Sequence, residues 1–143
     1  MRPPDRPELV LAFVCQEAGP DAEGRLDARG IYHDLFAPGF PARQERMVLV
    51  ALLEWDRADH GRFQFRMDLV GEDGKEAVTL NGHTDVDARR ADQPPARTQL
   101  IMPLDNVVFR EPGAFRLRVR VKGRDLTGPA LHLLRMEAPA EGR

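Results

Sequence analysis

The stretch that decides the fold is AFRLRVRVK, residues Ala114–Lys122, in which apolar and basic side chains alternate without a break. Successive side chains of a β-strand point to opposite faces of a sheet, so this pattern predicts one strand with an apolar face and a basic face. We expect the apolar face in a core. The side chains expected on the outward face are all cations, namely Arg116, Arg118, Arg120 and Lys122.

The rest of the chain repeats the β pattern. Residues 62–70 also alternate, and Asp73–Gly74 supplies the positive φ that a tight hairpin needs. Glu8–Cys15 is apolar on both faces, which predicts a central strand, and Pro103 within residues 98–109 predicts an edge strand or a bulge. We predict about eight strands and no helix, hence an all-β, single-domain antiparallel β-sandwich of immunoglobulin-like or C2-like type. The remaining predicted strands are 25–36, with a bulge at Gly30, and 46–55, 76–87 and 126–136.

Length and composition fit one folded domain. The chain has 143 residues, of which 42% are hydrophobic and 31% charged, as in soluble globular proteins. We expect the sandwich at 8–136, with an N-terminal extension at 1–7 and a tail at 137–143. No apolar stretch is long enough to cross a bilayer, and the N-terminus lacks the apolar region of a signal peptide. Since the single cysteine, Cys15, is interpreted as a small buried hydrophobe with no disulfide partner, we predict a cytoplasmic protein, peripheral on a membrane at most.

The charge distribution points to binding at the basic strand. The net charge is −2, and the outward face of the strand lacks interleaved aromatic residues, so a nucleic-acid partner is not expected. In extended geometry the four cations stand about 7 Å apart along one face. Two interpretations stay open: the cations pair with acids on adjacent strands, or they meet a partner. The partner would be an acidic protein surface or anionic lipid headgroups.

The loop FAPGFP, residues 36–41, is unusually apolar for a loop. Two prolines remove backbone donors, so the segment cannot continue a sheet. A rigid apolar loop loses little entropy on binding, which favours Phe36 and Phe40 as anchors for a partner. The other interpretation is that both rings fold back as a plug on the open end of the sandwich.

One group of residues has the chemistry of a metal site. His83, Asp85 and Asp87 share one face of a strand and could ligate a divalent cation, although a solvated outward face explains them as well. Asp56 and Asp59 beside His60 raise the possibility of a calcium loop, which Arg57 between the acids opposes. No nucleophile elbow, phosphate-binding loop or paired cysteines are present. An enzyme is therefore not predicted, and no cofactor is expected.

Three segments carry a resemblance to known proteins, namely ELVLAFVC at Glu8–Cys15, GIYHDLFAPGFPA at Gly30–Ala42 and EPGAFRLRVRVKG at Glu111–Gly123. Through them the chain resembles an uncharacterised family of small bacterial cytoplasmic β-sandwich proteins. It also looks like a membrane-extrinsic subunit of a bacterial photosynthetic reaction-centre and light-harvesting complex. The family has no known activity to transfer, and we predict a non-catalytic accessory or bridging subunit that docks on a larger assembly. We expect docking through the 36–41 loop, the chain ends and the basic face; the alternative is a metal-dependent binding module or enzyme using His83, Asp85 and Asp87.

Overall fold

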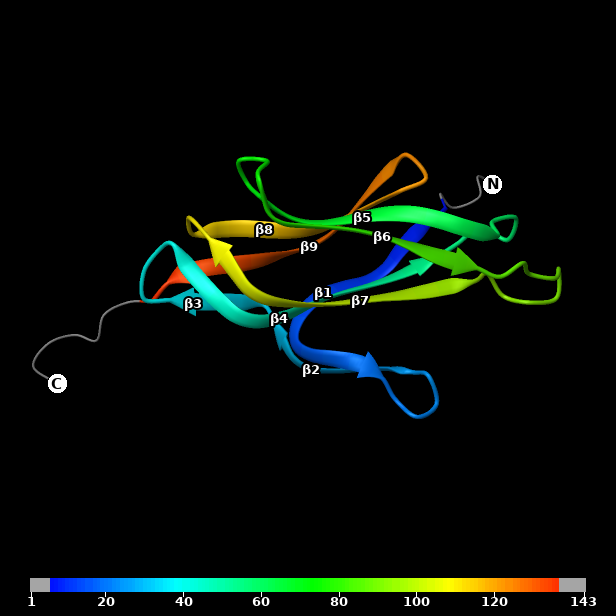
Figure 1. Cartoon of the computed structure of the whole chain (residues 1–143), viewed down its shortest axis with the longest axis horizontal. Helices are drawn as coiled ribbons and strands as arrows, with labels where there is room; N and C mark the ends of the chain where they lie inside the picture. Colours follow the sequence, from blue (N-terminus) through cyan, green and yellow to red (C-terminus); the bar gives the residue numbers. More distant parts are fainter. Residues whose placement is uncertain (1–5, 137–143) are drawn as a thin grey trace, which may run out of the picture.

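The computed structural model describes residues 6–136, which form nine β-strands and no helix (Figure 1). This confirms the prediction of an all-β protein. In chain order the strands are β1 (Glu8–Pro20), β2 (Leu26–Tyr32), β3 (Asp34–Ala37), β4 (Ala42–Glu54), β5 (Gly61–Gly71), β6 (Glu76–Val86), β7 (Arg97–Phe109), β8 (Gly113–Val121) and β9 (Arg124–Arg135).

The strands form two sheets that pack together as a sandwich-like fold. One sheet has the order β2-β1-β4-β7 and the other the order β3-β9-β8-β5-β6. As predicted, the apolar strand β1 is central, Pro103 lies on an edge strand, β7, and a hairpin turns at Asp73–Gly74 between β5 and β6. Neighbouring strands are antiparallel with one exception among the described residues, because β3 runs parallel to β9.

The predicted strand at 25–36 is wrong in one respect, since it is two strands in different sheets. β2 pairs with β1, whereas β3, which begins after His33, pairs with β9 in the other sheet. The bulge predicted at Gly30 is also wrong, because the pairing of β1 with β2 runs without a register shift from Val14–Tyr32 to Pro20–Leu26. Gly30 has a φ of 64°, and a Cβ there would lie 3.0 Å from Cβ of Gln16. Glycine is needed for this backbone conformation and close approach.

The main core lies between the two sheets. The inward residues that strand alternation predicts on β5 and β8 are buried or partly buried, and Met67, Leu69 and Val119 have no exposed surface. A second, small cluster lies on the opposite side of the four-stranded sheet, where Val48 and Val50 alternate with the main-core residues of β4. The end of β1 and β2 fold back over it, and Cys15 is fully buried there, as predicted. Burial raises the pKa of the Cys15 thiol, so the thiol is a poor nucleophile.

The two ends of the chain are only partly described. Of the predicted extension at 1–7, Pro7 is buried and its carbonyl accepts a hydrogen bond of 3.1 Å from Nη1 of Arg124. Residues 1–5 and the predicted tail at 137–143 lie outside the described residues. No helix in the described range is long and apolar enough to cross a membrane.

Candidate functional site

The basic residues of β8 lie on the outer face of the five-stranded sheet. β8 is flanked there by β5 and β9, so its outward side chains meet those of both neighbours. The register places Arg118 opposite Asp68 of β5, and Arg120 opposite Asp125 of β9. Directly opposed residues of an antiparallel pair project to the same face and interact. The acids needed to neutralise part of the basic face are therefore on the adjacent strands.

Asp68 is the centre of a charged network on this face, and it has no exposed surface. Its Oδ1 accepts hydrogen bonds from Nε of Arg66 at 2.9 Å and Oγ1 of Thr79 at 2.8 Å. Its Oδ2 accepts from Nη2 and Nε of Arg118, at 2.8 and 3.2 Å. Glu76 Oε1 completes the network, 3.1 Å from Nη2 of Arg66 and 3.5 Å from Nη2 of Arg118. Two cations and two anions thus neutralise one another.

The network fixes the charge of Asp68. Burial alone would raise the pKa of its carboxyl, but the hydrogen bonds from Arg118, Thr79 and Arg66 outweigh burial and lower that pKa below its ordinary value. The carboxylate is therefore ionised at neutral pH. It holds the two arginines in place and does not exchange protons there, so the group is a structural element of the face.

The other cations of the predicted basic face differ in their surroundings. Nε of Arg120 lies 2.8 Å from Oδ1 of Asp125, although its N–H is not directed at that oxygen. Arg116 is exposed, and within residues 6–136 it forms no ion pair; its Nη1 donates a hydrogen bond of 3.2 Å to the carbonyl of Gly128. Among the arginines of β8, Arg116 is therefore the one without an ion pair in the part of the chain that the structure describes.

Lys122 does not lie on this face, which corrects the sequence interpretation. β8 ends at Val121, and Lys122 adopts a φ of 53° in the turn, so the alternation of the strand stops before it. Its Nζ lies 2.7 Å from Oδ1 of Asp59 and 5.9 Å from the ring centre of Phe63. Phe63 packs against the core, so Lys122 lies at the β8–β9 turn beside a ring of the core and not on the basic face.

The structure separates the two phenylalanines of the 36–41 loop. Phe40 packs against the core, and Cζ of Arg135 lies 6.0 Å from its ring centre. Phe36, at the edge on β3, has 59% of its surface exposed. The plug interpretation thus describes the position of Phe40, whereas the ring of Phe36 stands in solvent.

Phe36 belongs to an apolar group that the sequence interpretation did not identify. Its partner in the parallel pairing is Leu134 of β9, which is 39% exposed. The backbone N–H of Met136, a residue 53% exposed, donates to the carbonyl of Ala37 at 2.7 Å and so extends this pairing. We call Phe36, Leu134 and Met136 the edge patch. The consecutive leucines 133 and 134 were a usable signal, because neighbours on a strand cannot both face the core.

The edge patch lies on the same side of the five-stranded sheet as the basic face. Leu134, His132 and Ala130 alternate along β9 on its outward side, since Leu131 and Leu133 are buried in the core. Ala130 is the register partner of Arg116 on β8. The outer face therefore runs from an apolar edge at β3 and β9, past Arg116, to the neutralised network around Asp68.

The possible metal ligands are exposed and do not converge. His83, Asp85 and Asp87 all lie in solvent, and Oδ1 of Asp85 is 3.2 Å from Nε of Arg62. Within residues 6–136 no group of three or more His, Cys, Asp or Glu side chains could hold a metal ion. In the other acidic loop, Asp59 accepts a hydrogen bond from the backbone N–H of Asp56 in addition to its ion pair with Lys122.

Comparison with known families gives one assignment. Residues 10–133 match a family of unknown function, DUF6941, and the chain belongs to this family. No curated protein matches the chain.

Proposed function

We propose that this DUF6941 protein is a non-catalytic accessory subunit that docks on a larger protein assembly through the edge patch and Arg116. The observation that supports this proposal is a group of three exposed apolar side chains on the same sheet face as Arg116, which has no ion pair among the described residues, where the other arginines of β8 are held in ion pairs. Apolar side chains exposed singly are normal on a protein surface, whereas a contiguous group is typical of an interaction site.

The chemistry of the face suits a protein partner. An exposed phenylalanine is a typical anchor of a protein interface, and an arginine elsewhere on the same face can pair with a partner carboxylate in a fixed geometry. Arg118 is occupied by Asp68, so it is less available for a partner. An anionic bilayer is the weaker proposal, because each cation near such a surface contributes only about 1 kcal/mol and, of the β8 arginines, Arg116 alone lacks an ion pair within the described residues.

The resemblance to membrane-extrinsic subunits of photosynthetic complexes determines where we propose to look for the partner. Membranes of the source cells, solubilised in a gentle detergent, are the starting material of choice. The wild-type protein is expected to migrate with a large complex in stoichiometric amount.

The double variant Phe36→Ser with Arg116→Gln tests the proposal. Both side chains are exposed, so the variant is expected to fold as the wild type does. Loss of the anchor and the cation is expected to weaken association at least about tenfold, which would move the protein to low-mass fractions in size separation. The measurement is its share in the complex, quantified by mass spectrometry.

A matched control lies on the four-stranded sheet. Ile31 is 47% exposed and Arg29 is exposed, and both are on β2, so Ile31→Ser with Arg29→Gln removes the same kinds of side chain elsewhere. This control is expected to migrate as the wild type does. Equal co-migration of the two double variants would contradict the proposal, and so would a wild-type protein that migrates alone.

A further inference from the structure

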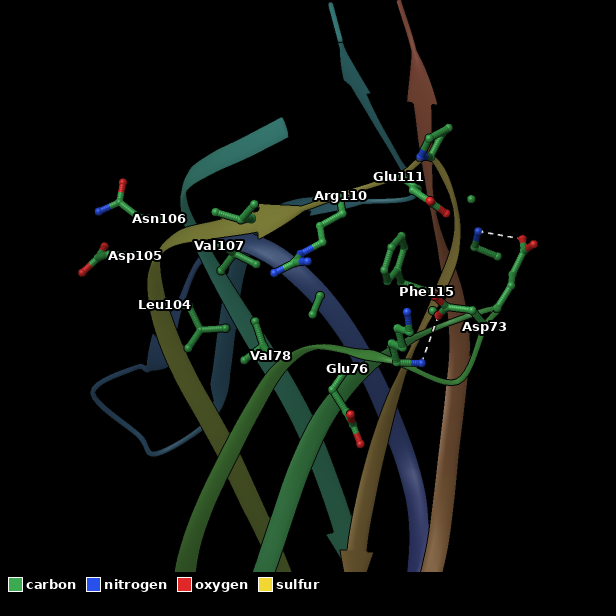
Figure 2. Close-up of a pocket in the computed structure, with 18 residues that line it drawn as sticks. Asp73, Glu76, Val78, Leu104, Asp105, Asn106, Val107, Arg110, Glu111 and Phe115 are labelled. Carbon is green, nitrogen blue, oxygen red and sulfur yellow. Dashed lines mark hydrogen bonds between the residues drawn. The ribbon is translucent and has the colours of Figure 1, made fainter. Parts of the chain in front are cut away.

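A cavity of about 1020 Å³ opens at one end of the sandwich, where the edge strands β6 and β7 of the two sheets face each other (Figure 2). Its lining comes from the start of β6, the end of β7, the start of β8, the β5–β6 turn and the β7–β8 loop. Four apolar side chains from three strands form its inner wall, and each belongs to the main core or packs against it: Val78, Leu104, Val107 and Phe115. The cavity is thus an opening towards the core.

The side chain of Arg110 enters this cavity. Figure 2 shows the side chain of Arg110, which follows β7, extending between Val107 and Phe115. In the described part of the chain, no carboxylate lies within ion-pair distance of the Arg110 guanidinium. The side chain of Arg110 also forms no hydrogen bond with another described residue. Arg110 is exposed, and its guanidinium lies beside the apolar wall, so an anion can reach it from solvent and form a charge-assisted contact while an apolar part of the same ligand packs on the wall.

Carboxylates around the cavity limit the anions that it can accept. Glu72 Oε1 accepts a hydrogen bond from the N–H of Ala114 at 2.9 Å, and Asp73 Oδ1 accepts from the N–H of Lys75 at 3.0 Å. Glu76 belongs to the Asp68 network, and Figure 2 shows Asp105 turned away from the cavity. Glu111, the residue after Arg110, also lines the cavity. Nearby like charge still disfavours a ligand with several negative charges. These surroundings therefore favour a ligand that carries one negative charge, placed at Arg110.

We infer that the cavity binds an amphiphilic monocarboxylate, that is, a fatty acid with an aliphatic chain. The carboxylate would form a two-point contact with the guanidinium of Arg110, and the chain would lie against Val78, Leu104 and Phe115. The volume is that of an ordinary small-molecule site, for which about 300–1,000 Å³ is usual. This inference goes beyond the docking function, because the cavity and the edge patch are formed by different residues.

Calorimetric titration of the folded chain with decanoate below its micellar concentration tests the inference. Decanoate is expected to bind at one site, and acetate, which has the charge but no chain, is expected to give no measurable heat of binding. Arg110→Gln is expected to weaken decanoate binding at least about tenfold, because the charge-assisted contact is lost. Arg29→Gln, at an exposed arginine on β2, is the control and is expected to bind as the wild type does.

A second variant tests the chain-binding wall. Val78→Trp places a larger side chain in the cavity and is expected to abolish decanoate binding, with its far-UV circular dichroism serving as the check of folding. No binding to the wild type would overturn the inference. Equal binding by wild type and Arg110→Gln would also overturn it, as would undiminished binding by a folded Val78→Trp variant.

Discussion

Replacing Asp68 with asparagine is expected to lower the free energy of unfolding by about 2–4 kcal/mol at pH 7. The carboxylate has no exposed surface and accepts hydrogen bonds from two arginines and one threonine. The amide would leave Arg66 and Arg118 facing each other with one acid, Glu76, between them. Urea unfolding at equilibrium is the measurement.

Asp125→Asn is the matched control for this substitution. Asp125, on β9, pairs with Arg120 of β8, the strand that also carries Arg118. The side chain of Asp125 is 54% exposed. Solvent screens an exposed ion pair, so Asp125→Asn is expected to lower the free energy of unfolding by no more than about 1 kcal/mol. Equal losses in the two variants would contradict the account of a buried network.

The stability of the Asp68→Asn variant is expected to depend on pH differently from that of the wild type. The pKa of Asp68 is lower in the folded protein than in the unfolded chain, where about 3.9 is usual. Below that unfolded value the unfolded state binds more protons, so the contribution of Asp68 is complete above about pH 4 and is lost as the pH falls through the folded pKa. The stability gap between wild type and Asp68→Asn is therefore expected to narrow on acidification. A gap that stays constant from neutral to strongly acidic pH would show that the charge is not its cause.

Trp55→Ala is expected to cost about 3–5 kcal/mol of unfolding free energy. Trp55 has no exposed surface, and its ring stacks on that of Phe63 with centroids 4.7 Å apart. Its Nε1 also donates a hydrogen bond of 2.8 Å to Oγ1 of Thr98 on β7. Removing the ring leaves a large cavity where the two sheets meet, because Phe63 and Thr98 belong to different sheets.

Trp55→Phe separates the contribution of ring packing from that of the hydrogen bond. It keeps an aromatic ring against Phe63 and removes the hydrogen bond to Thr98, so a loss of about 1–2 kcal/mol is expected. Both variants are compared with wild type by chemical unfolding. An alanine variant no less stable than the phenylalanine variant would contradict the packing role of the ring.

The period-two pattern was enough to predict the all-β class and the inward residues of β5 and β8. It could not predict which sheet each strand joins, since alternation specifies a face and not a neighbour. The break at His33 shows this limit. The stretch reads as one strand, yet its two halves pair with β1 and β9, and the second pairing is parallel.

The candidate site was predicted in part. The acid-pairing interpretation of the basic strand describes Arg118 and Arg120, but the burial of Asp68 depends on side chains from three strands that only the register brings together. The departure of Lys122 from the face follows from its positive φ in the turn. Arg110 gave no sequence signal, because its position depends on how the β6 and β7 edges face each other.

The most direct test of the proposed docking face is photo-crosslinking in the source cells. A photoreactive phenylalanine analogue is placed at position 36 in one variant and at position 31 of β2, which is similarly exposed, in another. The account predicts one adduct of defined mass from position 36 and none from position 31. The same adducts from both positions, or no adduct from position 36, would contradict it.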